Sequence, residues 1–179
     1  MLQLQSLQGK SNFLCQFVSN YAELTKGFNR LIKKGIHFIW DEVSQESFND
    51  LKQARISSPL LHPPDYRHDY FLYLVATGTT ITIVLVQDDD DDNDHVIYYL
   101  SWNLLDIKSR YGHVENLSLE AVHVVQRFRH YILLQKTTVI SDYNPMTYKL
   151  TCHLLGGKYS KWIIILQEFD LEFTAAKIK

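Results

Sequence analysis

The sequence predicts a mixed α/β fold of the α+β kind, in which a small helical region precedes a five-stranded mixed sheet with helices. Apolar residues recur at helical spacing through the first sixty residues, whereas β-branched and aromatic residues dominate after Pro59, Pro63 and Pro64. Three consecutive strands, a long amphipathic helix, a strand, further helices and a last strand then predict a mixed sheet with helices packed on it.

The first sixty residues carry helix signals, and residues 6–57 are predicted to be helical. Their apolar positions are Phe13, Leu14, Phe17, Val18, Tyr21, Leu24, Phe28, Leu31 and Ile32, in a pattern that continues past Asn20. Lys33, Lys34 and Gly35 predict a helix end, because cations favour the last carbonyls and glycine suits the following position. Asp41 is expected to cap the next helix, with Glu42 in its first turn.

The segment after the prolines is rich in strand-forming residues. Tyr70–Ala76 and Thr80–Val86 predict a hairpin around Gly78, and His95–Ser101 predicts a third strand. The acidic run at 88–94 joins the second and third strands. Adjacent side chains on an extended loop diverge and like charges repel unless solvated, so we interpret this run as a solvated turn rather than a metal site.

The last third of the sequence completes the predicted sheet. Apolar residues between 117 and 132 fall on one helical face. The remaining predicted elements are a strand at Thr137–Ser141, a helix at Lys158–Leu166 and a strand at Phe169–Thr174. Because the prolines mark a boundary near residues 60–66, we expect two regions, residues 1–60 and residues 61–179.

Composition narrows the function class. The chain has 179 residues and a net charge of −2, so a strongly basic nucleic-acid protein is not indicated. Without the six aspartates at 88–92 and 94, the net charge of the rest of the chain is +4, which is compatible with a mildly basic face. Cys15 and Cys152 form no CxxC pair and predict a reducing compartment. The N-terminus lacks signal-peptide features, so an intracellular protein without a membrane partner is expected.

Twelve short segments, taken in chain order, carry a family resemblance. They are Leu7–Leu14, Phe17–Tyr21, Leu31–Gly35, Phe38–Asp41, Ser47–Lys52, Ser58–Leu61, Tyr98–Ser101, Arg127–Ile132, Ser141–Asp142, Asn144–Met146, Lys161–Trp162 and Leu166–Leu171. The first six resemble the connection or thumb-like region after the polymerase domain in gypsy-class LTR retrotransposon reverse transcriptases. The others resemble the ribonuclease H (RNase H) domain tethered to it. The resemblance therefore implies a Pol polyprotein fragment with an RNase H-like fold.

The resemblance also implies a reaction and a cofactor. Domains of this kind cleave RNA in RNA–DNA hybrids with two Mg²⁺ ions, which activate the attacking water and stabilise the leaving oxygen. Mg²⁺ prefers hard oxygen ligands. Two divalent ions roughly 4 Å apart also repel strongly unless several carboxylates surround them. The family therefore holds the ions with four carboxylates.

Most of these carboxylates are missing from the sequence. Val75 stands at the position of the first aspartate, and Leu117 at that of the helical glutamate. Asp142 matches the third carboxylate, and the sequence ends at Lys179 before the fourth is reached, so we expect a domain truncated at its C-terminus. Asp142 is thus the sole matching family carboxylate, and productive Mg²⁺ binding is not expected.

Other interpretations of these positions stay open. Asp142 precedes Asn144–Met146 and also suits a helix cap. Glu115 and Glu120 flank Leu117, but each helical residue rotates by about 100°, so neither automatically replaces the missing glutamate. Thr82 replaces a family glycine after the first turn, which affects the expected hairpin geometry.

Three functions are consistent with the sequence. The first is a retrotransposon-derived pseudoenzyme with a structural role, whose partners are other Pol segments and, weakly, nucleic acid such as an RNA–DNA hybrid. Its candidate nucleic-acid contacts are Lys33, Lys34, Lys158 and Lys161. The second is an active hybrid-specific endonuclease in which Glu115 or Glu120 substitutes for the glutamate. The third is a host-adopted interaction module. The sequence contains no Tyr-x-Asp-Asp polymerase motif.

Overall fold

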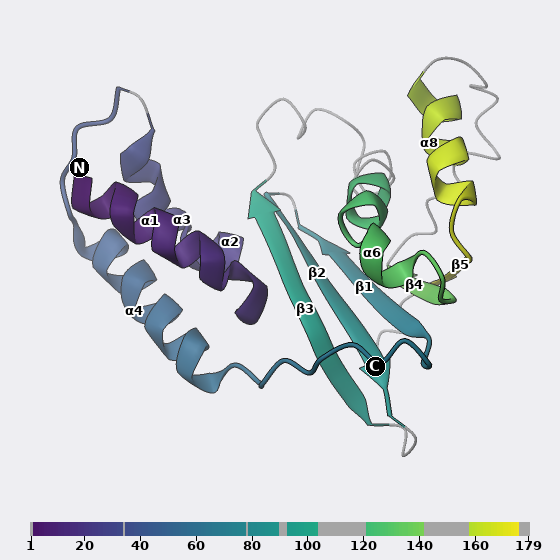
Figure 1. Cartoon of the computed structure of the whole chain (residues 1–179). Coiled ribbons are helices and arrows are strands. Elements are labelled where there is room, and N and C mark those ends of the chain that lie inside the picture. Colours follow the sequence, from purple (N-terminus) through teal and green to yellow (C-terminus); the bar gives the residue numbers. More distant parts are fainter. Residues whose placement is uncertain are drawn as a thin grey trace.

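A five-stranded mixed sheet, with helices on one face and a helical region beside its edge, forms the molecule (Figure 1). The structure is a computed structural model that describes residues 2–33, 35–77, 79–89, 93–103, 121–141 and 158–175. The strand order is β3-β2-β1-β4-β5. The predicted fold class, a mixed five-stranded sheet with helices, is confirmed.

The strands pair as a meander followed by crossovers. Their bounds are β1 Tyr70–Ala76, β2 Thr80–Asp88, β3 Asp94–Asn103, β4 Thr137–Ser141 and β5 Leu171–Ala175. β2 pairs antiparallel with β1 and with β3, whereas β4 pairs parallel with β1 and with β5. The bounds predicted for β1 and β4 match, and those of β2, β3 and β5 differ by one or two residues at their ends. Gly78, at the predicted hairpin turn, lies outside the described residues.

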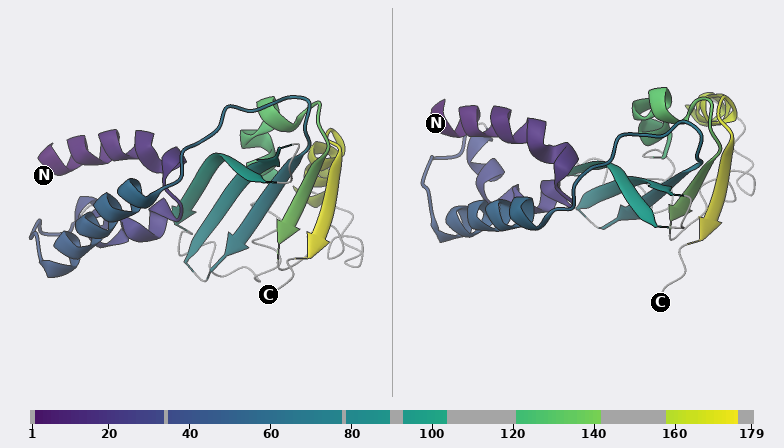
Figure 2. Two further views of the ribbon diagram at one scale, coloured as in Figure 1. Left: turned by 90° about the horizontal axis from the view of Figure 1, so that it is seen from below. Right: turned by 60° about the horizontal axis from the view of Figure 1, so that its bottom comes forward.

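The main core lies between the sheet and the helices on one face. Alternate residues of β1 and β2 are buried there, since successive strand residues face opposite sides. These strand residues are Tyr70, Leu72, Leu74, Ile81, Ile83 and Leu85. The helices on that face are residues 121–127, α6 (Arg129–Ile132) and α8 (Lys158–Gln167) (Figures 1 and 2). Phe128, Ile132 and Leu166 belong to the same core.

The helix predicted over residues 117–132 is interrupted. Its first residues, 117–120, lie outside the described residues, and the described part is helical from 121 to 127 and again in α6. Phe128 lies between them with φ −93° and ψ 9°, outside the α-helical region. Its ring is only 1% exposed, while its N–H still donates to the Val124 carbonyl at 2.8 Å. The break therefore turns the chain where this aromatic ring enters the core.

The N-terminal region is helical but is divided into short segments. Its elements are α1 Leu2–Leu14, η1 Cys15–Phe17, α2 Tyr21–Leu24, α3 Lys26–Asn29, η2 Arg30–Ile32 and α4 Glu42–Ser57. The apolar pattern predicted a helix that continues past Asn20, and this was wrong. The helical path ends at Phe17, because Val18 is extended, and Asn20 then takes a left-handed conformation with φ 55°, which asparagine tolerates, directly before α2.

A second hydrophobic cluster holds these helices together. Its buried members are Leu4, Val18, Tyr21, Phe28, Leu31 and Leu51. The predicted cap of α4 is confirmed, because the Ser44 N–H donates to Asp41 Oδ1 at 3.0 Å. A hydrogen bond from Arg30, together with those from Ser44, holds the pKa of Asp41 well below its usual range.

The helical region docks on the β3 edge of the sheet (Figure 2). The Ala22 N–H donates to Ser101 Oγ on β3 at 2.9 Å. Thr82 Oγ1 on β2 donates to Asn20 Oδ1 at 3.0 Å. The junction is thus fixed by directed polar contacts as well as by packing. Among the described residues, no helix has the length and apolar character needed to cross a membrane.

Candidate functional site

Val75, which the sequence predicts to stand at the family's first carboxylate position, lies near the end of β1. It pairs with Thr82 on β2, so the hairpin keeps a regular antiparallel register although Thr82 replaces a glycine. The Val75 side chain is 52% exposed, whereas the preceding Leu74 is buried in the core. An isopropyl group at this position offers no oxygen to a cation.

The neighbouring candidate positions fall largely outside the described residues. β1 pairs with β4 up to Leu74 and Ser141, the last residue of β4, and Asp142 follows it in the sequence. Asp142, Leu117, Glu115 and Glu120 themselves lie outside the described residues. Their roles therefore remain predictions from the sequence.

The donor set does not fit the two magnesium ions that the family uses. Val75 and Leu117, at two of the predicted carboxylate positions, carry hydrocarbon side chains. Within the described part of the chain, no three His, Cys, Asp or Glu side chains are placed to hold a metal ion. Hydrocarbon side chains cannot offset the repulsion between two divalent ions, so the donor set does not support a two-metal step.

The candidate lysines do not form one described cluster. Lys33 follows η2 in the helical region and Lys161 lies on α8, and both are exposed. Figures 1 and 2 place these two elements at opposite ends of the molecule. Lys34 and the side chain of Lys158 lie outside the described residues. Lys33 and Lys161 would therefore contact phosphates at two distant points and would not form one binding site.

Lys26 is a basic residue at the junction that sequence reasoning missed. Its Nζ donates to Thr79 Oγ1, beside the β1–β2 turn, at 3.0 Å and lies 3.4 Å from Glu23 Oε1. Fifty-three residues separate Lys26 from Thr79, so no local sequence signal could have revealed this contact.

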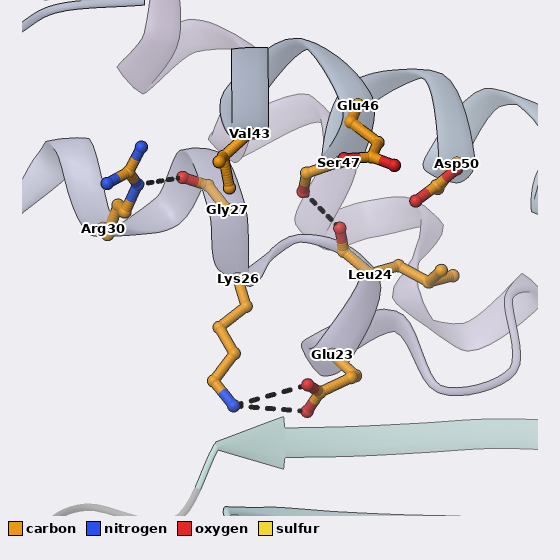
Figure 3. A pocket seen from close by; sticks show the side chains of 9 residues that line it. All are labelled: Glu23, Leu24, Lys26, Gly27, Arg30, Val43, Glu46, Ser47 and Asp50. Carbon is orange, nitrogen blue, oxygen red and sulfur yellow. Dashed lines mark hydrogen bonds and ion pairs between the residues drawn. The ribbon is translucent and has the colours of Figure 1, made fainter. Parts of the chain in front are cut away.

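A cleft of about 490 Å³ opens between α2, α3 and α4 (Figure 3). Both basic residues of this lining already have partners. Lys26 pairs with Glu23. Arg30 Nε donates to the Gly27 carbonyl at 2.8 Å, and the Arg30 guanidinium pairs with Asp41. Glu46 and Asp50 add carboxylates to the wall. This mixed lining disfavours binding of a phosphate backbone.

The close packing of α3 against α4 requires a glycine at position 27. A Cβ there would lie 2.7 Å from Ser47 Cβ and 2.8 Å from the Val43 carbonyl oxygen. We therefore expect Gly27→Ala to lower the free energy of unfolding by about 1–3 kcal/mol through overpacking. Urea denaturation measures the change.

Gly9 in α1 provides a matched control for this substitution. A Cβ at position 9 meets no atom within 4 Å. Gly9→Ala should therefore raise the free energy of unfolding by about 0.5–1 kcal/mol, because alanine favours a helix interior. Equal effects of the two substitutions would contradict the packing argument.

A second cleft, of about 610 Å³, lies under the linker between α4 and β1. The rings of His62 and His95 lie 4.2 Å apart, and His95 Nε2 lies 2.9 Å from Asp89 Oδ2. Asp89 Oδ1 also accepts a hydrogen bond from the Asn93 N–H at 2.9 Å, so it belongs to the acidic turn. Hydrogen bonds from Arg67 lower the pKa of Asp65 to about 2. The described part of this cleft is thus a network of paired acids and bases.

The family model and the sequence relatives that match this chain all point to reverse transcriptase polyproteins. Residues 40–139 match the family model described as "RNase H-like domain found in reverse transcriptase". The chain is similar to the "Retrovirus-related Pol polyprotein from transposon 297" of Drosophila melanogaster, with 26% identity over 99% of this chain and 16% of the relative. It is also similar to the "Transposon Tf2-3 polyprotein" of Schizosaccharomyces pombe, with 23% identity over 95% of this chain and 13% of the relative. The chain therefore spans about a sixth or less of these relatives.

Solved structures support the fold. The foamy viral protease-reverse transcriptase dRH in complex with double-stranded DNA aligns with a TM-score of 0.82 and 20% identity, over 100% of this chain and 32% of that chain. The same viral protein in complex with an RNA/DNA hybrid aligns with a TM-score of 0.80 and 20% identity, over 98% of this chain and 25% of that chain. Together with the sequence relatives, this likeness confirms the resemblance to retrotransposon Pol polyproteins.

Proposed function

The chain belongs to the family of RNase H-like domains found in reverse transcriptase, and we propose that it serves a Pol polyprotein as a domain that does not cleave. Its role would be structural, with weak contacts to nucleic acid. Within the proposal, residues 1–60 form the helical connection region and residues 61–179 form the RNase H-like region. The two hydrophobic clusters, which share no buried residue, support that division.

One observation carries the proposal of inactivity. Val75 occupies the first carboxylate position in an otherwise regular β1–β2 register. The two paired strands that should present a carboxylate therefore keep their register but present a hydrocarbon. Val75 removes one oxygen ligand, and Leu117 at the helical position removes another. A lone Asp142 would hold at most one cation loosely.

The proposed binding mode is weak and electrostatic. Neighbouring solved structures hold double-stranded DNA or an RNA/DNA hybrid, which makes a nucleic-acid duplex a reasonable ligand class. In this chain the exposed Lys33 and Lys161 offer separate phosphate contacts. Affinity supplied by such contacts should fall steeply with added salt, because each neutralised phosphate releases counterions.

Hydrolysis of a labelled RNA–DNA hybrid tests the proposal. We expect no cleavage above background with Mg²⁺ or Mn²⁺, because the carboxylates that would hold two ions are absent. The comparison variant is Asp142→Asn, which removes the one matching carboxylate. Metal-dependent cleavage by the unmodified chain that disappears in this variant would overturn the proposal and support an active endonuclease using Glu115 or Glu120.

A further inference from the structure

A cleft of about 440 Å³ lies between β3 and the helical segment that spans residues 121–132. Its lining residues are Tyr98, Gln126, Arg127, Phe128, His130 and Tyr131. Its volume falls within the ~300–1,000 Å³ typical of small-ligand sites. Among the described candidate residues, Val75, Lys33 and Lys161 are not part of this lining.

The floor of this cleft is aromatic. Phe128 is buried and meets the Tyr98 ring edge-on, with ring centroids 5.3 Å apart. The Tyr131 ring centroid lies 6.1 Å from that of Phe128 and 6.5 Å from that of Tyr98. His130 adds a ring 4.1 Å from Tyr131. Because Tyr98 and Tyr131 are half-buried, the core supports these rings while part of their surface faces the cleft.

The polar side chains among the described lining residues can donate hydrogen bonds, and none of them is a carboxylate. Arg127 and Gln126 are exposed, and Arg127 forms no ion pair with the described residues. Arg129, two residues further along, donates instead to Glu168 Oε2 at 2.6 Å. The clefts at α2–α4 and under the linker both contain carboxylates, so this lining differs from theirs. An uncommitted guanidinium beside aromatic rings favours an anion that carries a flat apolar group.

We propose that this cleft binds one unpaired nucleotide of a single-stranded nucleic acid. The base would stack on the Tyr98 and Tyr131 rings, and Arg127 would contact the phosphate. Aromatic platforms flanked by arginine are the usual means of holding single strands. A duplex hides its base faces within the stack, so this site goes beyond the duplex contacts of the proposed function.

Fluorescence anisotropy with a labelled deoxythymidine decamer and the full chain tests the site. Arg127→Ala should weaken binding about tenfold, through loss of the phosphate contact and the cation–π contribution. Arg129→Ala removes the same charge from the same helical segment and should change binding less than about twofold. Tyr131→Leu keeps the charge and should weaken binding about fivefold through loss of stacking. Thermal unfolding checks that each variant folds; if Tyr131→Leu does not, His130→Ala replaces it as the test of the aromatic floor and should likewise weaken binding.

Competition experiments separate this site from other sources of affinity. Thymidine monophosphate should displace the decamer at lower concentrations than inorganic phosphate or a polyglutamate peptide. If inorganic phosphate or polyglutamate displaced the decamer as well as thymidine monophosphate does, the proposal would be overturned. Equal losses of affinity in Arg127→Ala and Arg129→Ala would also overturn it. Binding of an RNA–DNA hybrid should be unchanged in Arg127→Ala, and a matching tenfold loss would also overturn it. Absence of hybrid binding would defeat the proposed duplex contacts and leave the single-strand site supported.

Discussion

Phe28→Ala is expected to lower the free energy of unfolding of the helical region by about 3–5 kcal/mol, because it empties the centre of that region's core. Phe28 is 0% exposed and lies among Leu4, Val18 and Leu31. Its ring centroid lies 6.4 Å from that of Trp40, in a stacked arrangement. Removal of the ring therefore loses both buried area and aromatic contacts.

Hydrogen exchange by mass spectrometry provides the measurement for this variant. Amides in residues 2–57 should exchange faster, whereas those in residues 70–88 should keep their protection if the two clusters are separate cooperative units. Phe13→Ala is the matched control, since Phe13 is 69% exposed and its loss should cost less than about 0.5 kcal/mol. Equal loss of protection in both regions would contradict the proposed division near residue 60.

Local patterns predicted the regular elements well. β1 and β4 begin and end where the β-branched and aromatic runs do, because alternation and strand propensity are properties of neighbouring residues. The cap at Asp41 is equally local, since it depends on a side chain and an N–H three residues away. The assignment of Val75 to a carboxylate position rests on its motif and stays a prediction.

Features that depend on long-range contact were not predictable. The left-handed Asn20 lies in a break between helices that apolar spacing alone would join, and its side chain bonds to Thr82, 62 residues away. The contact between Ala22 and Ser101 joins residues 79 positions apart. The cleft beside Arg127 likewise needs β3 and the helical segment to be brought together. Asp142 and Leu117 lie outside the described residues, so the candidate site stays a prediction.

Gln87 is another residue whose importance only the structure reveals. It lies near the end of β2, is 4% exposed and faces the linker that joins the two regions. Its Nε2 donates to the carbonyls of Asp65 and His68 at 2.7 and 3.0 Å, and its Oε1 accepts from the Asp65 N–H at 2.9 Å. A single amide thus satisfies three backbone groups of the linker, as a neighbouring strand would do.

Gln87→Leu should lower the free energy of unfolding by about 2–4 kcal/mol, because leucine keeps the volume but leaves these backbone groups without partners. Urea denaturation gives the magnitude, and trypsin should cleave faster after the exposed Arg67 as the linker loosens. Gln53→Leu is the matched control, since Gln53 is exposed on α4 and its replacement should change stability by less than about 0.5 kcal/mol. If both variants were equally stable and equally resistant at Arg67, the three hydrogen bonds would not anchor the linker, and packing alone would hold it to the sheet.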